Sequence, residues 1–165
     1  MSDKASFDWT NNELKAALDA MAEVCAPENR FPVVTSIRAY RNHKRLAEAW
    51  EPAEQVRNTL IQEYGEKVGD AGSWRITDPD GLAAFAELMQ ANGVAVELEV
   101  LSLAEVEKGY VKDPATGTKE PLGISPSAIG VLMDLHVLTE DGKVVAEEVE
   151  GEALERDEAQ EDAPE

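Results

Sequence analysis

The amino-acid sequence predicts an α+β, mostly helical fold, in which a long antiparallel helical hairpin packs beside a small antiparallel sheet. The first observation is a pattern between Ser36 and Tyr64, where apolar residues recur every three or four positions and so share one face of a helix. These residues are Leu46, Ala49, Trp50, Ala53, Val56, Leu60 and Tyr64. The second observation is the alternation of apolar and other residues from Val94 to Val100, which predicts a half-buried strand.

A shorter helix is predicted before the long one. Its apolar face consists of Leu14, Ala17, Leu18, Met21, Ala22 and Cys25. Asn11 or Asn12 is the expected N-cap and Pro27 the expected end, and the short connection that follows predicts an antiparallel pair. In the long helix Pro52 predicts a kink rather than a break, because the apolar stripe continues in phase beyond it. Gly65 is the expected left-handed C-cap.

The remaining elements follow from turn and capping signals. A turn-rich loop at 65–73 precedes a short extended piece at 74–76, and Asp78-Pro79 then begins a helix. Residues 101–107 fit either a continued strand or a helical turn, and 109–122 is predicted to be an exposed loop. Ser125-Pro126 begins a further short helix. The pairs Val137-Leu138 and Val144-Val145 are predicted to form a small hairpin.

Composition places the chain among single-domain proteins with an acidic surface. Its 165 residues carry a net charge of -19, with 34 acidic against 15 basic residues. We expect one domain over residues 1–150 and a disordered acidic tail over 151–165, since 147–165 alone hold ten acidic residues and one basic. This charge disfavours binding to nucleic acid or to an anionic membrane. With no signal peptide, no membrane-spanning apolar run and one cysteine, the chain is expected to be a soluble cytosolic protein.

No pattern in the sequence predicts catalysis, so we expect a protein that is not an enzyme and has no cofactor. His43 and His136 are far apart and lack neighbours at metal-ligand spacing, and Cys25 is expected to pack against the core. The glycines of 65–72 lack the Lys-Ser/Thr ending of a phosphate loop. Glu97 and Glu99 share one strand face, which is expected to be solvated. No catalytic, cofactor-binding or metal-binding residue is therefore predicted.

The candidate partner-binding residues gather in the first half of the long helix. Residues 30–45 carry five basic side chains and no acidic one, in a protein that is otherwise acidic. We predict a partner-binding set of Arg38, Tyr40, Arg41, Lys44, Arg45 and Trp50. The alternatives are that the aromatic residues pack in the core, that the protein's own acids balance the basic face, or that the acidic tail docks on it.

The order of the motifs resembles a family of small tailed-phage and prophage proteins of unassigned function. The resemblance covers roughly Leu14 to Leu138 and follows a fixed series of short motifs. They are Ile37-x-x-x-x-Asn42, Arg57-x-x-Leu60-Ile61-x-x-Tyr64-Gly65-Glu66-Lys67, Ile76-x-Asp78-Pro79, the Phe85 helix, Val96-Glu97-Leu98 and Ile124-Ser125-Pro126. The resemblance implies a location in the host cytoplasm or in a virion, and it implies no catalytic residue.

Two functions from different classes fit these observations. The first is a non-enzymatic, phage-derived protein that acts by protein–protein contact as a virion or assembly component, and is a homo-oligomer through its long helix. The second is an acidic inhibitor of a host enzyme, either an anti-defence protein or a DNA mimic. Mimicry needs acids at fixed positions on the folded surface, and the share of the charge that lies in 147–165 weighs against it.

Overall fold

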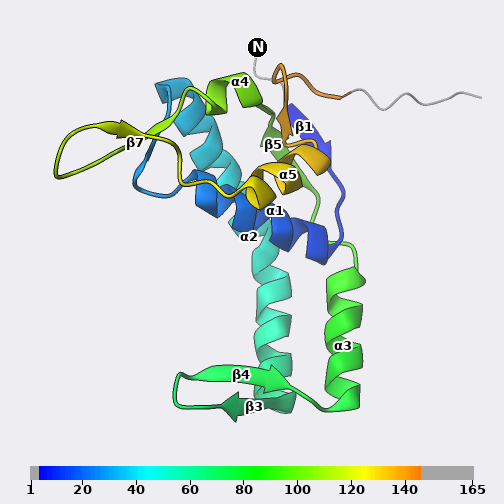
Figure 1. Ribbon diagram of the computed structural model, residues 1–165. Helices are drawn as coiled ribbons and strands as arrows, with labels where there is room; N and C mark the ends of the chain where they lie inside the picture. The colour runs from blue at the N-terminus through cyan, green and yellow to red at the C-terminus, as the bar shows by residue number, and fades with distance from the viewer. Residues whose placement is uncertain (1–3, 146–165) are drawn as a thin grey trace, which may run out of the picture.

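The computed structural model describes residues 4–145, so the predicted acidic tail lies outside the described residues. The fold is α+β and mostly helical, as predicted, with two helices of a long hairpin beside small antiparallel sheets. Figure 1 shows two parts, a broad head and a narrow arm that projects from it. We define the arm as residues 54–90, which comprise the C-terminal part of the long helix, a β-hairpin and the helix that returns to the head.

The N-cap of the first helix, α1 (Asn11–Val24), lies at least one residue earlier in the chain than expected. Thr10 is the N-cap: its hydroxyl accepts from the backbone N–H of Glu13, and the Glu13 carboxylate accepts from the N–H of Thr10. This reciprocal pair satisfies two backbone donors that a helix start leaves without partners. Asn11 is instead buried, and its side-chain amide donates to the carbonyl of Leu88, 2.8 Å away. The expectation of a cap at Asn11 or Asn12 was therefore wrong.

The long helix, α2 (Val33–Tyr64), spans 32 residues and continues through Pro52, as predicted. Its upper and lower halves run in different directions in Figure 1, with the change near the middle of the helix. An interior proline lacks the N–H that would bond to the preceding turn, which accounts for a bend there. Gly65 does not take the expected left-handed conformation: its φ is -81° and its ψ is 139°, because the chain passes directly from α2 into a strand.

Short strands form four small sheets within residues 4–145. β1 (Lys4–Phe7) pairs with β5 (Val96–Glu99), β3 (Gly65–Val68) with β4 (Ser73–Ile76), and β2 (Asn29–Arg30) with β7 (Tyr110–Lys112), which also pairs with β8 (Lys119–Glu120). All of these pairs are antiparallel. The predicted loops at 65–73 and 109–122 thus each contain strands. Between β3 and β4 the chain turns through Gly69 and Gly72, both at positive φ, where a side chain would be strained.

The expected hairpin of Val137-Leu138 with Val144-Val145 was wrong. β9 (Leu138–Thr139) pairs in parallel with β6 (Leu101–Ser102), and the carbonyl of Val137 accepts from the N–H of Leu101. Val137 and Leu138 are buried, whereas Val144 and Val145 are about half exposed. Val137 and Leu138 therefore lie next to β6, whose Leu101 is also buried. Pairing with the half-exposed Val144 and Val145 would bury less apolar surface.

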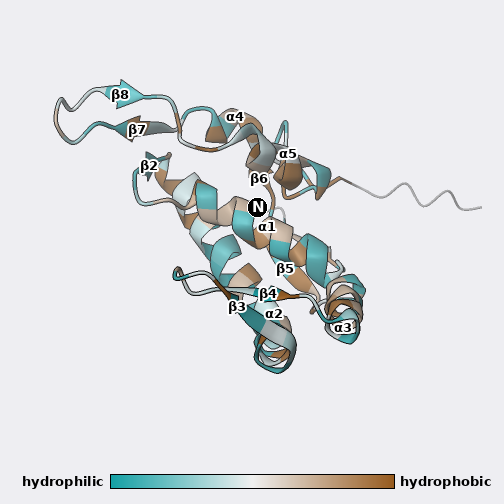
Figure 2. Cartoon of the chain, turned by 60° about the horizontal axis from the view of Figure 1, so that its bottom comes forward, coloured by the Kyte–Doolittle hydropathy of each residue, from teal (hydrophilic) through white to brown (hydrophobic). Residues whose placement is uncertain are grey.

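The other helices follow their predicted signals. α3 (Pro79–Gln90) is capped by Asp78 and α5 (Pro126–Asp134) by Ser125, each with a proline in the first turn. α4 (Leu103–Val106) resolves the ambiguous stretch as one helical turn after β6. Figure 2 shows hydrophobic residues on α5, whereas β3 and β8 are mainly hydrophilic.

The hydrophobic core lies in the head. Its largest fully buried side chains come from α1, the first half of α2, β5, α5 and the strands β6 and β9. They include Trp50, Leu14, Met21, Leu46, Leu98, Leu101, Leu132 and Leu138. Along α2 the buried residues end at Ala53, so the core ends where the arm begins.

A single buried amide joins α2 to β5. Asn42 is fully buried, its Nδ2 donates to the backbone carbonyl of Glu99 (2.7 Å), and its Oδ1 accepts from the backbone N–H of the same residue (2.9 Å). The side chain thus makes the two hydrogen bonds that a neighbouring strand would make with Glu99. β1 pairs with β5, so Asn42 satisfies backbone groups of β5 from the helix that packs on it.

We predict that Asn42→Ala lowers the free energy of unfolding by about 2–5 kcal/mol, since it leaves two buried backbone groups without a partner and creates a cavity. Chemical denaturation of both proteins measures the difference. Asn58→Ala, at an exposed position of the same helix, is the matched control and should change stability by less than about 0.5 kcal/mol. Equal effects of the two substitutions would show that the Asn42 hydrogen bonds contribute nothing specific.

Candidate protein-binding surfaces

Five of the six predicted partner-binding residues lie on the outer side of α2, and one does not. Tyr40 is 65 % exposed, and Arg38, Arg41, Lys44 and Arg45 are partly or fully exposed. Trp50 is only 2 % exposed and belongs to the core, so its inclusion in the partner-binding set was wrong. The helical spacing that places Trp50 with Leu46 and Ala53 on the inner stripe is the signal that favoured a core role.

The protein's own acids balance part of this basic segment. Arg41 forms an ion pair with the buried carboxylate of Glu99 (3.7 Å), and Lys44 lies 3.9 Å from Glu48. The Arg45 guanidinium donates to the backbone carbonyl of Glu97 (3.1 Å). No ion pair or hydrogen bond is seen for the side chain of Arg38 among residues 4–145. Glu99, which was expected on a solvated face beside Glu97, is 4 % exposed, because α2 covers it.

Exposed apolar side chains accompany the basic ones at the start of α2. Val33, Val34, Ile37 and Tyr40 are 74, 61, 44 and 65 % exposed. Val33, Ile37 and Tyr40 are spaced by four and three residues, so they line one stripe next to the arginines. This exposed apolar stripe was not predicted from the sequence, although the helical spacing of its residues can be recognised there. We call Val33, Val34, Ile37, Arg38, Tyr40, Arg41 and Lys44 together the basic–apolar face.

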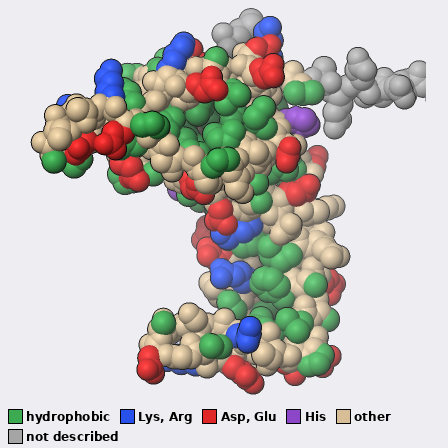
Figure 3. All heavy atoms as spheres, in the orientation of Figure 1, with side chains coloured by type: hydrophobic (Ala, Val, Ile, Leu, Met, Phe, Trp, Pro, Cys, Tyr) green, Lys and Arg blue, Asp and Glu red, His purple; other side chains and the backbone are tan. Residues whose placement is uncertain are grey.

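The arm presents a second surface with exposed apolar side chains. Val56, Val68, Trp74 and Leu82 are each about half exposed, and among residues 54–90 only Gly81 is fully buried. Figure 3 shows hydrophobic atoms along the arm between α2 and α3. A hollow of about 260 Å³ lies where the arm meets the head, between Pro52 and Val56 of α2 and Leu88 of α3. In the arm, α3 therefore covers only part of the predicted apolar stripe of α2, and Val56 remains half exposed.

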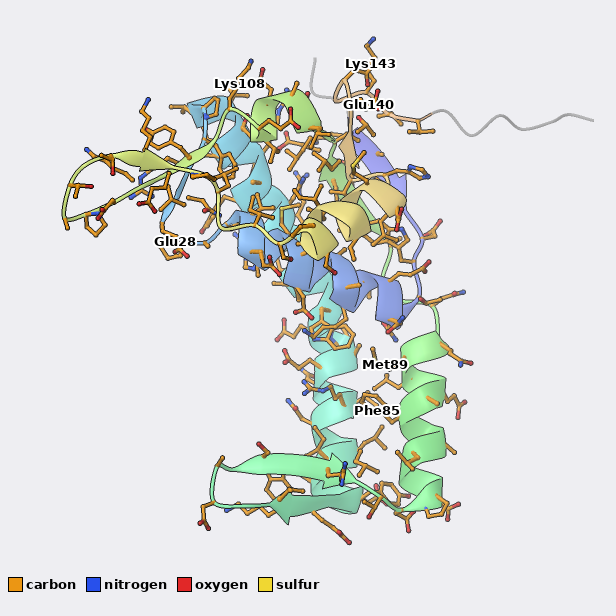
Figure 4. All side chains as sticks on the ribbon, viewed as in Figure 1. Glu28, Phe85, Met89, Lys108, Glu140 and Lys143 are labelled. Carbon is orange, nitrogen blue, oxygen red and sulfur yellow. The ribbon has the colours of Figure 1, made fainter. Side chains whose placement is uncertain are left out.

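Two contacts hold the arm in shape. At its tip α2 and α3 approach closely at Gly81, where an added Cβ would lie 2.6 Å from Cβ of Tyr64. At its base, the N–H of Gly93 donates to the carbonyl of Trp9 and Asn11 bonds to Leu88, which fastens the end of α3 to the start of α1. Figure 4 shows Phe85 and Met89 on the α3 side of the arm that faces α2.

We predict that Gly81→Ala loosens the arm without unfolding the head. The new methyl group clashes with Tyr64 and with the side chain of Ile76, at a cost of about 1–3 kcal/mol. Amide hydrogen exchange should quicken in α3 and in the C-terminal part of α2, and remain slow in α1. Gly130→Ala, which meets nothing within 4 Å, is the control. Unchanged exchange in α3 would contradict the close-packing role of Gly81.

Cys25 and His136, two groups considered for chemistry, each lie at a position that the packing of the head accounts for. Burial raises the pKa of the Cys25 thiol to about 11, so the sulfur is protonated at neutral pH and is a poor nucleophile. His136 is exposed and has a φ of 59°, at the end of α5, where the N–H of Val137 bonds back to the carbonyl of Leu132. Such a left-handed residue closes a helix, so its conformation has a structural cause. Among residues 4–145 no three His, Cys, Asp or Glu side chains gather as a metal site.

A hollow of about 670 Å³ lies on the head. It lies between β1, the end of α5 and the segment at 144–145. Phe7, Trp9 and Val100 line its apolar part, and Asp134 and His136 stand among its polar residues. It has no charged side chain that is also buried, and we assign it no reaction.

We predict that Cys25 reacts slowly with iodoacetamide in the native protein. A pKa raised from 9.0 to about 11 reduces the thiolate fraction at pH 8 by about 100-fold. Mass spectrometry of timed reactions measures the rate, and the same protein in denaturant gives the unshielded reference. A native rate close to the denatured one would mean that Cys25 is open to solvent and ionised.

Comparison with known proteins gives no relative for this chain: no family model, no curated protein and no solved structure matches it. None of the helices within residues 4–145 has both the length and the hydrophobicity needed to cross a lipid bilayer. The interpretation of the two surfaces therefore depends on their own chemistry.

Proposed function

We propose that this chain is a non-enzymatic protein that acts by protein–protein contact, as a virion-associated or assembly component of a tailed phage, with the arm as its binding element. In this proposal it works in the host cytoplasm or in the particle. The observation that carries the proposal is the arm itself, which leaves Val56, Val68, Trp74 and Leu82 half exposed on a thin projection.

Ordering the arm costs conformational entropy, and the arm buries little apolar surface in return. Fixing the backbone of one residue costs about 1–2 kcal/mol, and the usual compensation is burial of apolar side chains. Between residues 54 and 90 only Gly81, which has no side chain, is fully buried. Exposed apolar patches of this kind on a shaped element are typical of surfaces that bind another protein. Trp74 is the strongest single candidate, because tryptophan is enriched among residues that dominate binding energy.

The test uses the double variant Trp74→Ser/Leu82→Ser, whose substitutions lie at exposed positions. Tagged wild-type and variant proteins are produced in the phage's host, and their copies per purified particle and per precursor particle are counted by mass spectrometry. We expect the variant to lose more than about tenfold of its incorporation. Val144→Ser/Val145→Ser, at equally exposed apolar positions outside the arm, should incorporate normally.

Two results would contradict the proposal. Absence of the wild-type protein from both particles and precursors would remove the assembly role. Recovery of the wild-type protein in a stable complex with a nucleic-acid-binding host enzyme, displaced by DNA, would point instead to the acidic-inhibitor function. The thermal midpoint of the arm variant should stay within about 4 °C of the wild type, which shows that any loss is not due to unfolding.

A further inference from the structure

The arm and the basic–apolar face carry opposite charge. Residues 54–90 hold seven acidic and three basic side chains, whereas the basic–apolar face holds three basic side chains, Arg38, Arg41 and Lys44, and no acidic one. The acids of the arm are Glu54, Glu63, Glu66, Asp70, Asp78, Asp80 and Glu87. Their negative potential raises the pKa of Tyr64 at the arm's tip, mainly through Glu63 and to a smaller extent through Asp80 and Asp78.

Both surfaces also present apolar side chains of similar size. The basic–apolar face exposes Val33, Ile37 and Tyr40, and the arm exposes Trp74 and Leu82. An apolar centre with charges around it is the usual anatomy of a protein interface. Here both surfaces expose apolar side chains and carry opposite local charge, which favours contact between them over contact of either with itself.

The two surfaces cannot meet within one molecule. They lie at opposite ends of α2, whose 32 residues extend about 48 Å at about 1.5 Å per residue. Figure 1 shows the start of α2 at the far end of the head from the arm. A contact between them therefore joins two copies. Because each copy has one arm and one face, the contact is head-to-tail and its repetition gives a ring or an open chain.

We propose that the arm of one copy docks on the basic–apolar face of the next. This rests on the proposed function, and it names the partner of the arm as a second copy of this chain. Trp74 and Leu82 pack against Val33, Ile37 and Tyr40, and the acids of α3 and β3 face Arg38 and Lys44.

Three alternative contacts are less well matched than docking of the arm on the basic–apolar face. The acidic residues 147–165 of the same chain include only two large apolar residues, Val149 and Leu154, to cover four exposed ones. Two arms that paired symmetrically would each bring an excess of negative charge to the other. Nucleic acid would meet a chain whose total net charge is -19.

The test combines two variants, one with substitutions in the arm and one with substitutions in the basic–apolar face. The arm variant is Trp74→Ser/Leu82→Ser, and the face variant is Val33→Ser/Tyr40→Ser, both at exposed positions. Sedimentation velocity at tens of micromolar and physiological salt gives the mass of each. We expect the wild type to form oligomers and each variant alone to be weakened by more than about tenfold. An equimolar mixture should form a 1:1 pair and no larger species, because one good arm meets one good face.

The control variant changes exposed apolar residues that lie outside both surfaces. Val144→Ser/Val145→Ser should associate like the wild type. A face variant that still forms dimers alone would show that arms pair with arms, and a mixture that stays monomeric would refute head-to-tail docking. A strictly monomeric wild type also overturns the inference, and a cross-link from Lys44 to residues 147–165 would then assign the face to the chain's own acidic end. These measurements use purified protein alone. A failure to associate would therefore overturn this inference without deciding whether the protein is incorporated into particles.

Discussion

The fold depends on the pair of hydrogen bonds between the buried side chain of Asn42 and the backbone of Glu99. They fix β5 against the first half of α2 and leave the other edge of β5 for β1. The carboxylate of Glu99 is held close to Arg41 by the same contact. A buried amide with both of its polar atoms bonded specifies one register, since a shift of β5 by one residue would break both bonds at once. The strand β5 is therefore held on α2 by two side-chain hydrogen bonds as well as by apolar packing.

The arm, unlike the head, has no hydrophobic core of its own. It has no fully buried side chain between residues 54 and 90, and its shape comes from α2, which it shares with the head, and from the contacts of Gly81 and Asn11. Because α2 is continuous through Pro52, the arm's direction is set by the head's core. A binding element built in this way is held in place before it meets a partner, which reduces the entropy lost on association.

Local signals predicted much of this fold, and the failures share a cause. The caps at Asp78 and Ser125, the continuity of α2 and the strand at 96–99 could be predicted because each depends on residues a few positions apart. β1, and the parallel pairing of β9 with β6, depend on partners far along the chain, which no local pattern reveals.

The candidate surfaces show the same limit. The basic residues of α2 could be found from the sequence, because charge along one helix face is visible without a structure. The burial of Trp50 and Glu99 could not be settled in that way, since both depend on what α2 packs against. The exposure of Val33, Val34 and Ile37 was missed for the opposite reason: apolar residues at the start of a helix suggest burial, and no described element covers them.

The charges along α2 are unevenly distributed between its two ends. Five basic residues lie between positions 30 and 45, near the end where the helix's own peptide dipoles are positive, and an acidic excess lies in the arm at the other end. If two copies associate as proposed, the opposite local charges at the two ends of α2 favour encounters in which unlike ends approach each other. Orientation in solution would then precede recognition at short range.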